Sequence, residues 1–279
     1  MGNKVIFVTG ASRGFGELIV EQALAKGHSV VATARNPRTI VERFGDRPNV
    51  LAVALDVTDE AQAHAAAMAA IDRFGRIDVL VNNAGYGLLG AVEEASAKEI
   101  EAVYRTNVFG LLAVTRAVLP YMRRRRSGHV INFSSIGGYA AWAGFGVYCS
   151  TKFAVEGLTE ALAQELQPLG IHATVVEPGA FRTDFLDAKS LAVSPRSIED
   201  YRATSGAVRE FAAGINRAQP GDPAKLAQVL IDFLDAPNPP VRLPLGSDTV
   251  AAIEAKNAAT SELLNRWRSV SVSTDFSPT

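Results

Sequence analysis

The chain has 279 residues, of which 48% are hydrophobic and 20% are charged, so it is long enough to bury a sizeable core. Its 28 Lys and Arg nearly balance 29 Asp and Glu, and the formal net charge of −1 provides no overall field that would attract nucleic acid or an anionic membrane. Cys149 is the only cysteine, which excludes an internal disulfide.

Short β-branched runs alternate with helical patterns along most of the chain. The predicted strands are KVIFVT (4–9), SVVATA (29–34), NVLAVAL (49–55), DVLVNN (78–83), GHVINFS (128–134), HATVVEP (172–178) and VRLPL (241–245). Helices are predicted at 16–26, 39–44, 60–74, 98–126, 147–167, 222–234 and 248–267. Repeated strand–helix units predict an α/β, doubly wound fold, in which a parallel sheet carries helices on both faces. In such a sheet, ligands bind outside the carboxyl ends of the strands.

The regular alternation stops after Pro178, where a long segment carries few core signals. We expect a single domain over 1–279, with a lid at about 180–205 and a C-terminal extension at about 245–279. The tail from Ser269 onward is expected to fray.

Membrane, nucleic-acid and metal functions find no support in the sequence. No uninterrupted apolar run approaches the roughly 18 residues of a membrane helix, and the amino-terminal stretch lacks the apolar region of a secretory signal. The basic run 123–126 is interpreted as a solvated helix end. The histidines at 28, 64, 129 and 172 have no metal-ligand spacing, so no metal is expected. We therefore expect a soluble, cytoplasmic protein.

A glycine-rich turn, TGASRGFG, follows the first predicted strand and leads into a helix. Its glycines permit a tight turn and let backbone N–H groups approach a pyrophosphate at the positive helix N-terminus. The cofactor-binding residues expected here are Gly10, Ser12, Arg13, Gly14, Phe15 and Gly16.

The end of the second strand predicts which dinucleotide binds. An acidic residue at this place would bind the ribose 2′-hydroxyl of NAD, but the sequence has Ala34 there, followed by Arg35. Arg13 adds a second cation close by. Two guanidinium groups without a carboxylate suit a 2′-phosphate, so we expect NADP(H) rather than NAD(H). The alternative is that both arginines are merely solvated.

The third and fourth strands end in further candidate cofactor residues. Asp56, followed by Val57, is placed to bind the adenine amino group. The NNAG stretch places Asn83, Ala84 and Gly85 where the backbone can pass close to the ribose.

The stretch SSIGGYAAWAGFGVYCSTK, residues 134–152, has no charge before its final residue, Lys152. Tyr148 lies four positions earlier, so the two side chains would share one helix face. Together with TGASRGFG, NNAG and PGAFRT, this pattern resembles the short-chain dehydrogenase/reductase family, in its standard-length branch, over about residues 4–185. The resemblance implies a Rossmann-type fold and hydride transfer with a nicotinamide cofactor.

The resemblance also implies a catalytic Asn-Ser-Tyr-Lys tetrad, which falls on Asn107, Ser135, Tyr148 and Lys152. Ser134 competes for the serine position, but the family's serine precedes its tyrosine by thirteen positions, and 148 − 135 = 13. Tyr148 would be the proton donor, with its pKa lowered from about 10 toward 7 by the Lys152 ammonium.

The other members of the implied site have supporting roles. Ser135 would hold the carbonyl oxygen, Lys152 would bind the nicotinamide ribose, and Asn107 would hold a water molecule. The PGAFRT stretch would contribute Pro178, Gly179, Phe181 and Thr183 to the cofactor site, with Thr183 at the carboxamide.

We predict an NADP(H)-dependent reductase of an apolar ketone or aldehyde, or the reverse alcohol dehydrogenase. The apolar groups expected around the pocket are Leu88, Leu89, Tyr139, Trp142, Phe145, Phe181 and Phe185. The alternative is a non-catalytic dinucleotide-sensing protein on the same fold. The family's longer branch of sugar-nucleotide epimerases and dehydratases is disfavoured, because its TGxxGxxG loop is absent. The resemblance also implies a homodimer or homotetramer formed through the helices at 98–126 and 147–167.

Overall fold

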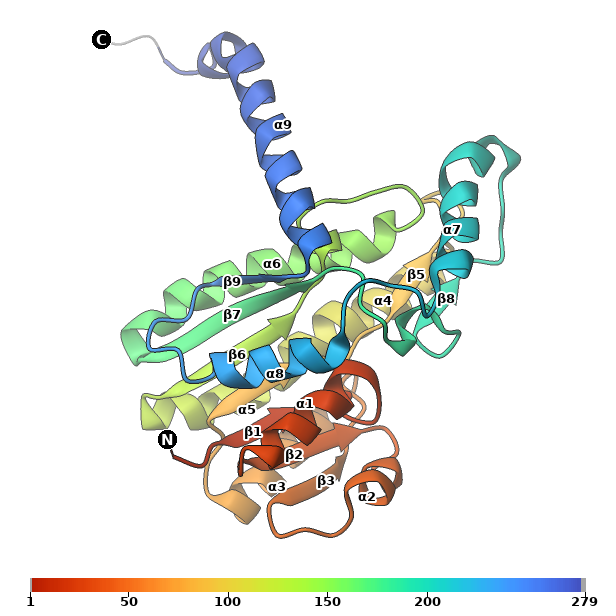
Figure 1. Ribbon diagram of the computed structural model, residues 1–279. Coiled ribbons are helices and arrows are strands. Elements are labelled where there is room, and N and C mark those ends of the chain that lie inside the picture. The colour runs from red at the N-terminus through yellow and green to blue at the C-terminus, as the bar shows by residue number, and fades with distance from the viewer. Residues whose placement is uncertain (1, 277–279) are drawn as a thin grey trace.

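The structure, a computed structural model, describes residues 2–276 and contains a seven-stranded parallel sheet between two layers of helices (Figure 1). In spatial order the strands are β3 (Val50–Ala54), β2 (Ser29–Ala34), β1 (Val5–Val8), β4 (Val79–Asn82), β6 (Gly128–Phe133), β7 (Ile171–Pro178) and β9 (Arg242–Leu245). The order reverses between β1 and β4, which is the switch point where such folds bind ligands. The predicted doubly wound fold is confirmed.

Each face of the sheet has its own hydrophobic core. On one face, α1 (Gly14–Ala25), α2 (Arg38–Phe44) and α8 (Pro223–Phe233) supply buried side chains such as Ile19, Ile40 and Leu230. On the other face, the buried side chains come from α3 (Glu60–Phe74), α5 (Leu111–Arg125) and α6 (Gly146–Leu166). Since β-branched and aliphatic residues point to both sides of the strands, two helical layers are needed to exclude water from them.

The helix predicted at 98–126 is interrupted. It consists of α4 (Ala97–Tyr104), a π-helical turn over Arg105–Gly110, and α5. The extra residue of a π turn rotates the side chains that follow it, and such turns occur frequently at functional sites.

The segment expected to be a lid, at about 180–205, and two elements outside it form regular structure that the sequence did not predict. β5 (Gly87–Leu89) and β8 (Leu191–Val193) form a small parallel sheet, and α7 (Ala207–Ile215) follows. A 3₁₀ turn at Asp184–Leu186 precedes β8. Strands of three residues are too short to produce a recognisable alternation, which is why this region resembles a loop in the sequence.

The C-terminal helix α9 (Ser247–Val272) projects away from the body of the molecule (Figure 1). It is longer than the predicted helix at 248–267, because the helix continues into the tail expected to fray. There the Ser271 hydroxyl also donates to the Trp267 carbonyl. Positions 277–279 of that tail lie outside the described residues. Within residues 2–276, no helix has both the length and the apolar character needed to cross a bilayer.

Candidate active site

A cavity of about 1120 Å³ opens at the carboxyl ends of the central strands. The loops that follow β1, β2, β3, β4, β6 and β7 all contribute to its wall, and the segment 183–192 forms another side. The predicted residues on this wall are Gly10, Ser12, Arg13, Gly14, Phe15, Arg35, Asp56, Val57, Asn83, Ala84, Gly85, Ser135, Tyr148, Lys152, Pro178, Gly179, Phe181 and Thr183. Gly16 and Asn107 lie behind the wall.

The glycine loop has the backbone conformation that its sequence indicates. Gly10 and Gly14 have φ values of +66° and +56°, which side chains other than glycine rarely permit. Gly16 has a packing role, because a Cβ there would lie 2.2 Å from the Gly10 carbonyl oxygen and 2.7 Å from Asn83 Nδ2. Arg13 is the N-cap of α1 and makes no side-chain cap. The first N–H groups of α1 therefore suit an anion.

The two predicted cations differ in their surroundings. Arg35 lies on the cavity wall directly after Ala34, which ends β2. Arg13 reaches across the cavity instead, where its Nη2 donates to the Lys189 carbonyl at 2.6 Å. Lys189, which sequence reasoning missed, adds another cation to the wall. Asp56 accepts from Thr58 N at 2.9 Å and from Thr58 Oγ1 at 2.7 Å, which fixes the loop after β3.

Tyr148 and Lys152 lie one turn apart on α6, and both are almost completely buried. Lys152 Nζ donates to the Phe133 carbonyl at 2.8 Å and lies 5.8 Å from the centre of the Tyr148 ring. Burial lowers the pKa of Lys152 to about 8, while the charge of Glu156 opposes that shift.

The prediction that the pKa of Tyr148 is lowered is wrong when only the protein's own groups act on it. Burial raises the pKa of this phenol well above its usual value, and only a hydrogen bond with Ser135 opposes the rise. The reason is geometric, because the Lys152 ammonium binds the Phe133 carbonyl and faces the tyrosine ring. Tyr148 is therefore held as the neutral acid at neutral pH.

The two adjacent serines point to different partners. Ser135 caps the 3₁₀ turn Ile136–Gly138 by accepting from Gly137 N at 3.1 Å, and its hydroxyl meets Tyr148. Ser134 is 5% exposed, and its hydroxyl donates to the Lys152 carbonyl at 3.5 Å. The geometry therefore favours Ser135 as the serine that faces a substrate.

Asn107 lies in the π-helical turn, and its side chain forms hydrogen bonds with Tyr86 and Thr151. Its Nδ2 donates to the Tyr86 carbonyl at 2.9 Å and to Thr151 Oγ1 at 3.1 Å, and its Oδ1 accepts from Tyr86 N at 3.1 Å. A Cβ on Gly85 would lie 3.1 Å from the same Oδ1. Asn107 thus shapes the turn after β4, directly behind the cavity wall.

The end of the cavity around Tyr148 is apolar, with Phe145 and Phe185 at ring-centroid distances of 6.1 and 5.6 Å. Of the predicted apolar groups, Trp142, Phe145, Phe181 and Phe185 line the cavity. The prediction is wrong for three residues: Leu88 and Leu89 pack into small cores, and Tyr139 Oη donates to Asn257. Apolar lining residues that the sequence did not predict include Leu186, Leu191, Val208, Phe211, Ala212 and Ile215.

Comparison with known proteins assigns the family. The profile described as short chain dehydrogenase matches residues 4–193. Oxidoreductase BOA17 of Botryotinia fuckeliana is 40% identical over 272 residues, covering 96% of this chain and 98% of the relative. The chain belongs to the short-chain dehydrogenase family. It is an oxidoreductase of that family, as the tetrad pattern predicted.

Other members of the short-chain dehydrogenase family extend this comparison. A 3-ketodihydrosphingosine reductase of Bacteroides thetaiotaomicron is 38% identical, with 88% of this chain and 89% of the relative covered. A crystal structure of a short-chain dehydrogenase from Streptomyces avermitilis is 41% identical with a TM-score of 0.91, covering 99% of this chain and all of that one.

Two solved structures similar to this chain hold different dinucleotides. ElxO with NADP bound is 26% identical with a TM-score of 0.74, and the match covers 90% of this chain and all of that one. A short-chain dehydrogenase of Burkholderia phymatum in complex with NAD is also 26% identical, with a TM-score of 0.78 and 99% and 98% covered. Structural neighbours of this chain therefore bind NADP or NAD, and similarity alone does not choose between these two cofactors.

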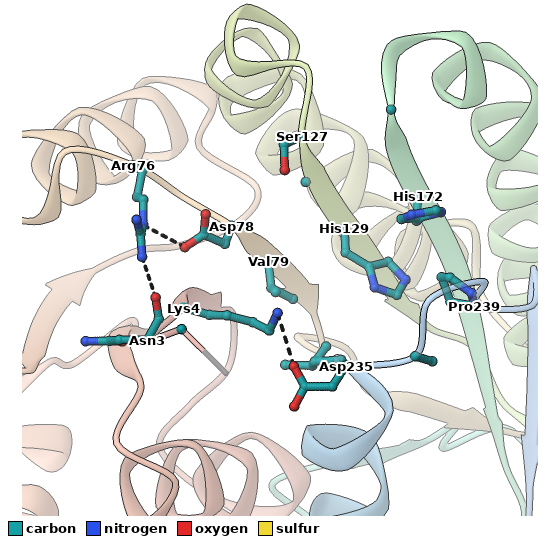
Figure 2. A pocket seen from close by; sticks show the side chains of 15 residues that line it. Asn3, Lys4, Arg76, Asp78, Val79, Ser127, His129, His172, Asp235 and Pro239 are labelled. Carbon is teal, nitrogen blue, oxygen red and sulfur yellow. Dashed lines mark hydrogen bonds and ion pairs between the residues drawn. The ribbon is translucent and has the colours of Figure 1, made fainter.

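A second cavity, of about 440 Å³, lies at the amino ends of the strands and has a polar lining (Figure 2). Lys4 pairs with Asp235 at 3.3 Å, and Arg76 pairs with Asp78 at 2.9 Å. His129 is buried there, and burial lowers its pKa to about 3. Its Nε2 lies 2.9 Å from Thr174 Oγ1, which itself donates to the Pro240 carbonyl. These groups satisfy one another.

Proposed function

We propose that this protein is an NADP(H)-dependent reductase of apolar ketones or aldehydes, working reversibly on the corresponding alcohols. One observation carries the proposal: Tyr148, Ser135 and Lys152 lie on the wall of the same cavity as the glycine loop and Arg35. A proton donor and a dinucleotide cradle in one cavity are what hydride transfer to a carbonyl requires.

The residues present fit a dinucleotide. The uncapped N-terminus of α1 and the left-handed glycines Gly10 and Gly14 suit the pyrophosphate. Arg35 beside Ala34 suits a 2′-phosphate, because a guanidinium attracts the phosphate and no carboxylate repels it. Asp56 and the backbone of 83–85 would hold the adenosine, and 178–183 would hold the nicotinamide end. When bound, the cofactor supplies or accepts the hydride.

The protein's own residues then manage the proton. In the reducing direction Tyr148 Oη gives its proton to the carbonyl oxygen as the hydride reaches the carbon, and the raised pKa of Tyr148 keeps that proton available at neutral pH. Ser135 donates a hydrogen bond to the same oxygen. Lys152, with a pKa of about 8, is mainly cationic at neutral pH and stabilises the phenolate that remains. Asn107 holds the turn at Gly85 and Tyr86 behind them.

An apolar substrate is supported by the aromatic and aliphatic side chains around Tyr148. Phe145 and Phe185 pack near its ring, and the segment that contains Leu186 and α7 adds further apolar lining. Burial of apolar substrate surface would supply binding energy at about 25 cal/mol per Å². A relative named for a 3-keto lipid-like substrate, at 38% identity, supports the same class.

Self-association remains a prediction. Phe109, next to α5, and Phe153, on α6, are 58% and 44% exposed on the two long helices for which the family resemblance implies contacts between subunits. We propose that the protein forms a homodimer or homotetramer, and sedimentation analysis of the purified protein tests this oligomeric state. We also propose that it is located in the cytoplasm.

The proposed activity is tested by cofactor oxidation with a panel of carbonyl compounds. We expect NADPH consumption with bulky apolar ketones or aldehydes, and kcat/KM at least about tenfold higher with NADPH than with NADH, since one charge-assisted hydrogen bond contributes about 1.5 to 3 kcal/mol. A preference for NADH would contradict the role of Arg35. Tight dinucleotide binding without turnover of any compound would favour the non-catalytic alternative.

A further inference from the structure

Two buried carboxyl groups and one partly exposed guanidinium meet one helical turn beyond Lys152. Glu156 of α6 is 3% exposed, and Glu177 of β7 is fully buried. Arg242 of β9 donates from one atom, Nη1, to Glu156 Oε2 at 2.5 Å and to Glu177 Oε1 at 2.6 Å. Its Nε and Nη2 bind Glu160 Oε1 at 3.2 and 2.7 Å. One guanidinium thus faces three carboxyl groups, two of which are shielded from water.

Hydrogen bonding in this cluster requires a proton. Arg242 Nη1 binds Glu156 Oε2 and Glu177 Oε1 at 2.5 and 2.6 Å, so the two carboxyl groups lie side by side. Two carboxylates have no donor between them unless one is protonated. Apart from the Ser134 hydroxyl beside Glu156, no donor within residues 2–276 reaches Glu156 Oε1 or Glu177 Oε2. Burial raises the pKa of Glu156 to about 8, and the charge of Glu177 adds to that rise. Ser134 and Arg242 oppose it.

The cluster contacts the candidate catalytic residues through α6. Glu156 follows Lys152 by four positions, so both side chains lie on one face of the helix. When Glu156 is ionised, its negative charge raises the pKa of Lys152 against the effect of burial. Ser134, which donates to the Lys152 carbonyl, also lies beside the Glu156 carboxyl.

The cluster also supports the turn that carries Ser135. A Cβ on Gly138 would lie 2.2 Å from Ser134 Oγ and 2.9 Å from Glu156 Oε1, so only a glycine lets the turn Ile136–Gly138 close this far. Ser135 is the N-cap of that turn. The Glu156 carboxyl therefore packs against the turn that begins at Ser135.

We propose that Glu156 and Glu177 share one proton, and that this carboxyl pair is a positioning element that keeps Lys152 cationic and holds Ser135 in place. The part that concerns Lys152 and Ser135 rests on the proposed function, whereas the shared proton does not. Because the pair carries a single negative charge, replacing either member moves that charge to the other. The direction in which the pKa of Lys152 changes in each variant therefore shows whether the two carboxyl groups share a proton.

The first test measures the pKa of Lys152 directly, by NMR titration of protein labelled with ¹³C at the lysine ε-carbon. Lys152→Arg identifies the signal by its loss. Glu156→Gln leaves the charge on Glu177, which lies off the lysine's helix, and should lower the pKa of Lys152 by on the order of half a pH unit. Glu177→Gln places the charge wholly on Glu156, so the pKa should stay the same or rise.

The matched control is Glu160→Gln, which removes another carboxylate bound to Arg242, one whose side chain is 51% exposed. It should leave the Lys152 titration unchanged. A lower Lys152 pKa in Glu177→Gln would mean that both carboxyls are ionised, and it would overturn the shared proton. An unchanged pKa in Glu156→Gln would overturn the support of Lys152. If Glu156→Gln fails to fold, the direction in Glu177→Gln still decides.

The second test measures kcat/KM against pH. The loss of activity at alkaline pH should begin at lower pH in Glu156→Gln than in the wild type or in Glu160→Gln, because Lys152 loses its proton earlier. If the pKa of Lys152 shifts as expected but the protein reduces no carbonyl compound, the proposed function is wrong and the shared proton of Glu156 and Glu177 is still supported. If turnover is normal, and if all variants have the same Lys152 pKa and lose activity at the same alkaline pH, the proposal about the carboxyl pair is wrong while the proposed function stands.

Discussion

The two ends of the parallel strands, called here the amino edge and the carboxyl edge of the sheet, hold their charges differently. At the amino edge, Lys4 pairs with Asp235 at 3.3 Å and Arg76 pairs with Asp78 at 2.9 Å. At the carboxyl edge, the buried Lys152 donates to a backbone carbonyl. The amino-edge cavity is small and polar, and its charges cancel within it (Figure 2). The carboxyl-edge cavity is larger and has an apolar end.

The difference shows which edge is built for chemistry. A buried cation without a carboxylate bound to it is costly, and such groups are kept mainly where a reaction uses them. At the amino edge the pKa of His129 is also far from its usual value, but its ring is hydrogen-bonded to Thr174 and simply stays neutral. A perturbed pKa alone therefore does not mark a catalytic residue, and it needs a cavity and a reaction partner beside it.

The largest effect is expected from Tyr148→Phe. The ring remains but the proton donor is lost, so turnover should fall on the order of 10³-fold, while the dissociation constant of NADPH should stay within about threefold. Steady-state kinetics and fluorescence titration measure the two quantities. Tyr104→Phe is the control, because it removes a hydroxyl bound to Ser150 outside the cavity and should leave turnover unchanged. Near wild-type turnover of Tyr148→Phe would remove its catalytic role.

Ser135→Ala should lower kcat about 100-fold, because one hydrogen bond to the developing oxyanion is lost. Ser134→Ala should cost less than about tenfold, since that hydroxyl binds the Lys152 backbone rather than the substrate. The two variants differ by one position and one contact. The reverse order of effects would assign the substrate-binding role to Ser134.

The amino edge should control stability rather than turnover. Because His129 has a folded-state pKa of about 3 and an ordinary unfolded value of 6.5, below pH 6.5 the unfolded chain binds a proton that the folded chain excludes. This contribution to stability is present above pH 6.5 and is lost at about 1.4 kcal/mol per pH unit as the pH falls.

Urea unfolding at pH 7, 6 and 5 should therefore show a steeper loss of stability in the wild type than in His129→Gln, by about 2 kcal/mol at pH 5. The kcat/KM of the folded variant at pH 7 should equal that of the wild type. The same pH dependence in both proteins would mean that His129 is not held neutral.

The smallest effect concerns the choice of cofactor. Ala34→Asp should shift the ratio of kcat/KM for NADPH and NADH toward NADH by about tenfold or more, because the carboxylate repels a 2′-phosphate and accepts from a ribose hydroxyl. Ala34→Ser is the control for size and should shift the ratio less. No shift in Ala34→Asp would mean that the 2′ position lies away from the end of β2.

The features predicted from the sequence are those with strong local signals. Long β-branched runs gave the seven strands, and the glycine turn and the spacing of Tyr148 and Lys152 placed the site at the carboxyl edge. What escaped prediction depends on distant partners. β5 pairs with β8 about one hundred residues later, and α7 supplies apolar lining from beyond the expected lid. Helical periodicity predicts a continuous helix over 98–126 and does not reveal the π turn at Arg105–Gly110. The position of Asn107 behind the cavity wall therefore could not be predicted.

The pKa of Tyr148 also escaped prediction, for a physical reason. Spacing indicates that a lysine is near, but burial and the direction of the ammonium decide whether the phenolate or the phenol is favoured. The sequence does not reveal the buried pair of Glu156 and Glu177, because its members lie on different elements and Arg242, from a third element, binds both. Contacts of this kind have no signature in a single sequence.

The most direct test of the account is transfer of deuterium from NADPH labelled on the reactive nicotinamide carbon. With a bulky apolar ketone, the wild type should place the deuterium on the carbinol carbon of the product, as mass spectrometry detects, and Tyr148→Phe should do so on the order of 10³-fold more slowly. If NADPH binds to the carboxyl-edge cavity but no carbonyl compound acquires deuterium, the cavity is not a site of hydride transfer and the account is wrong.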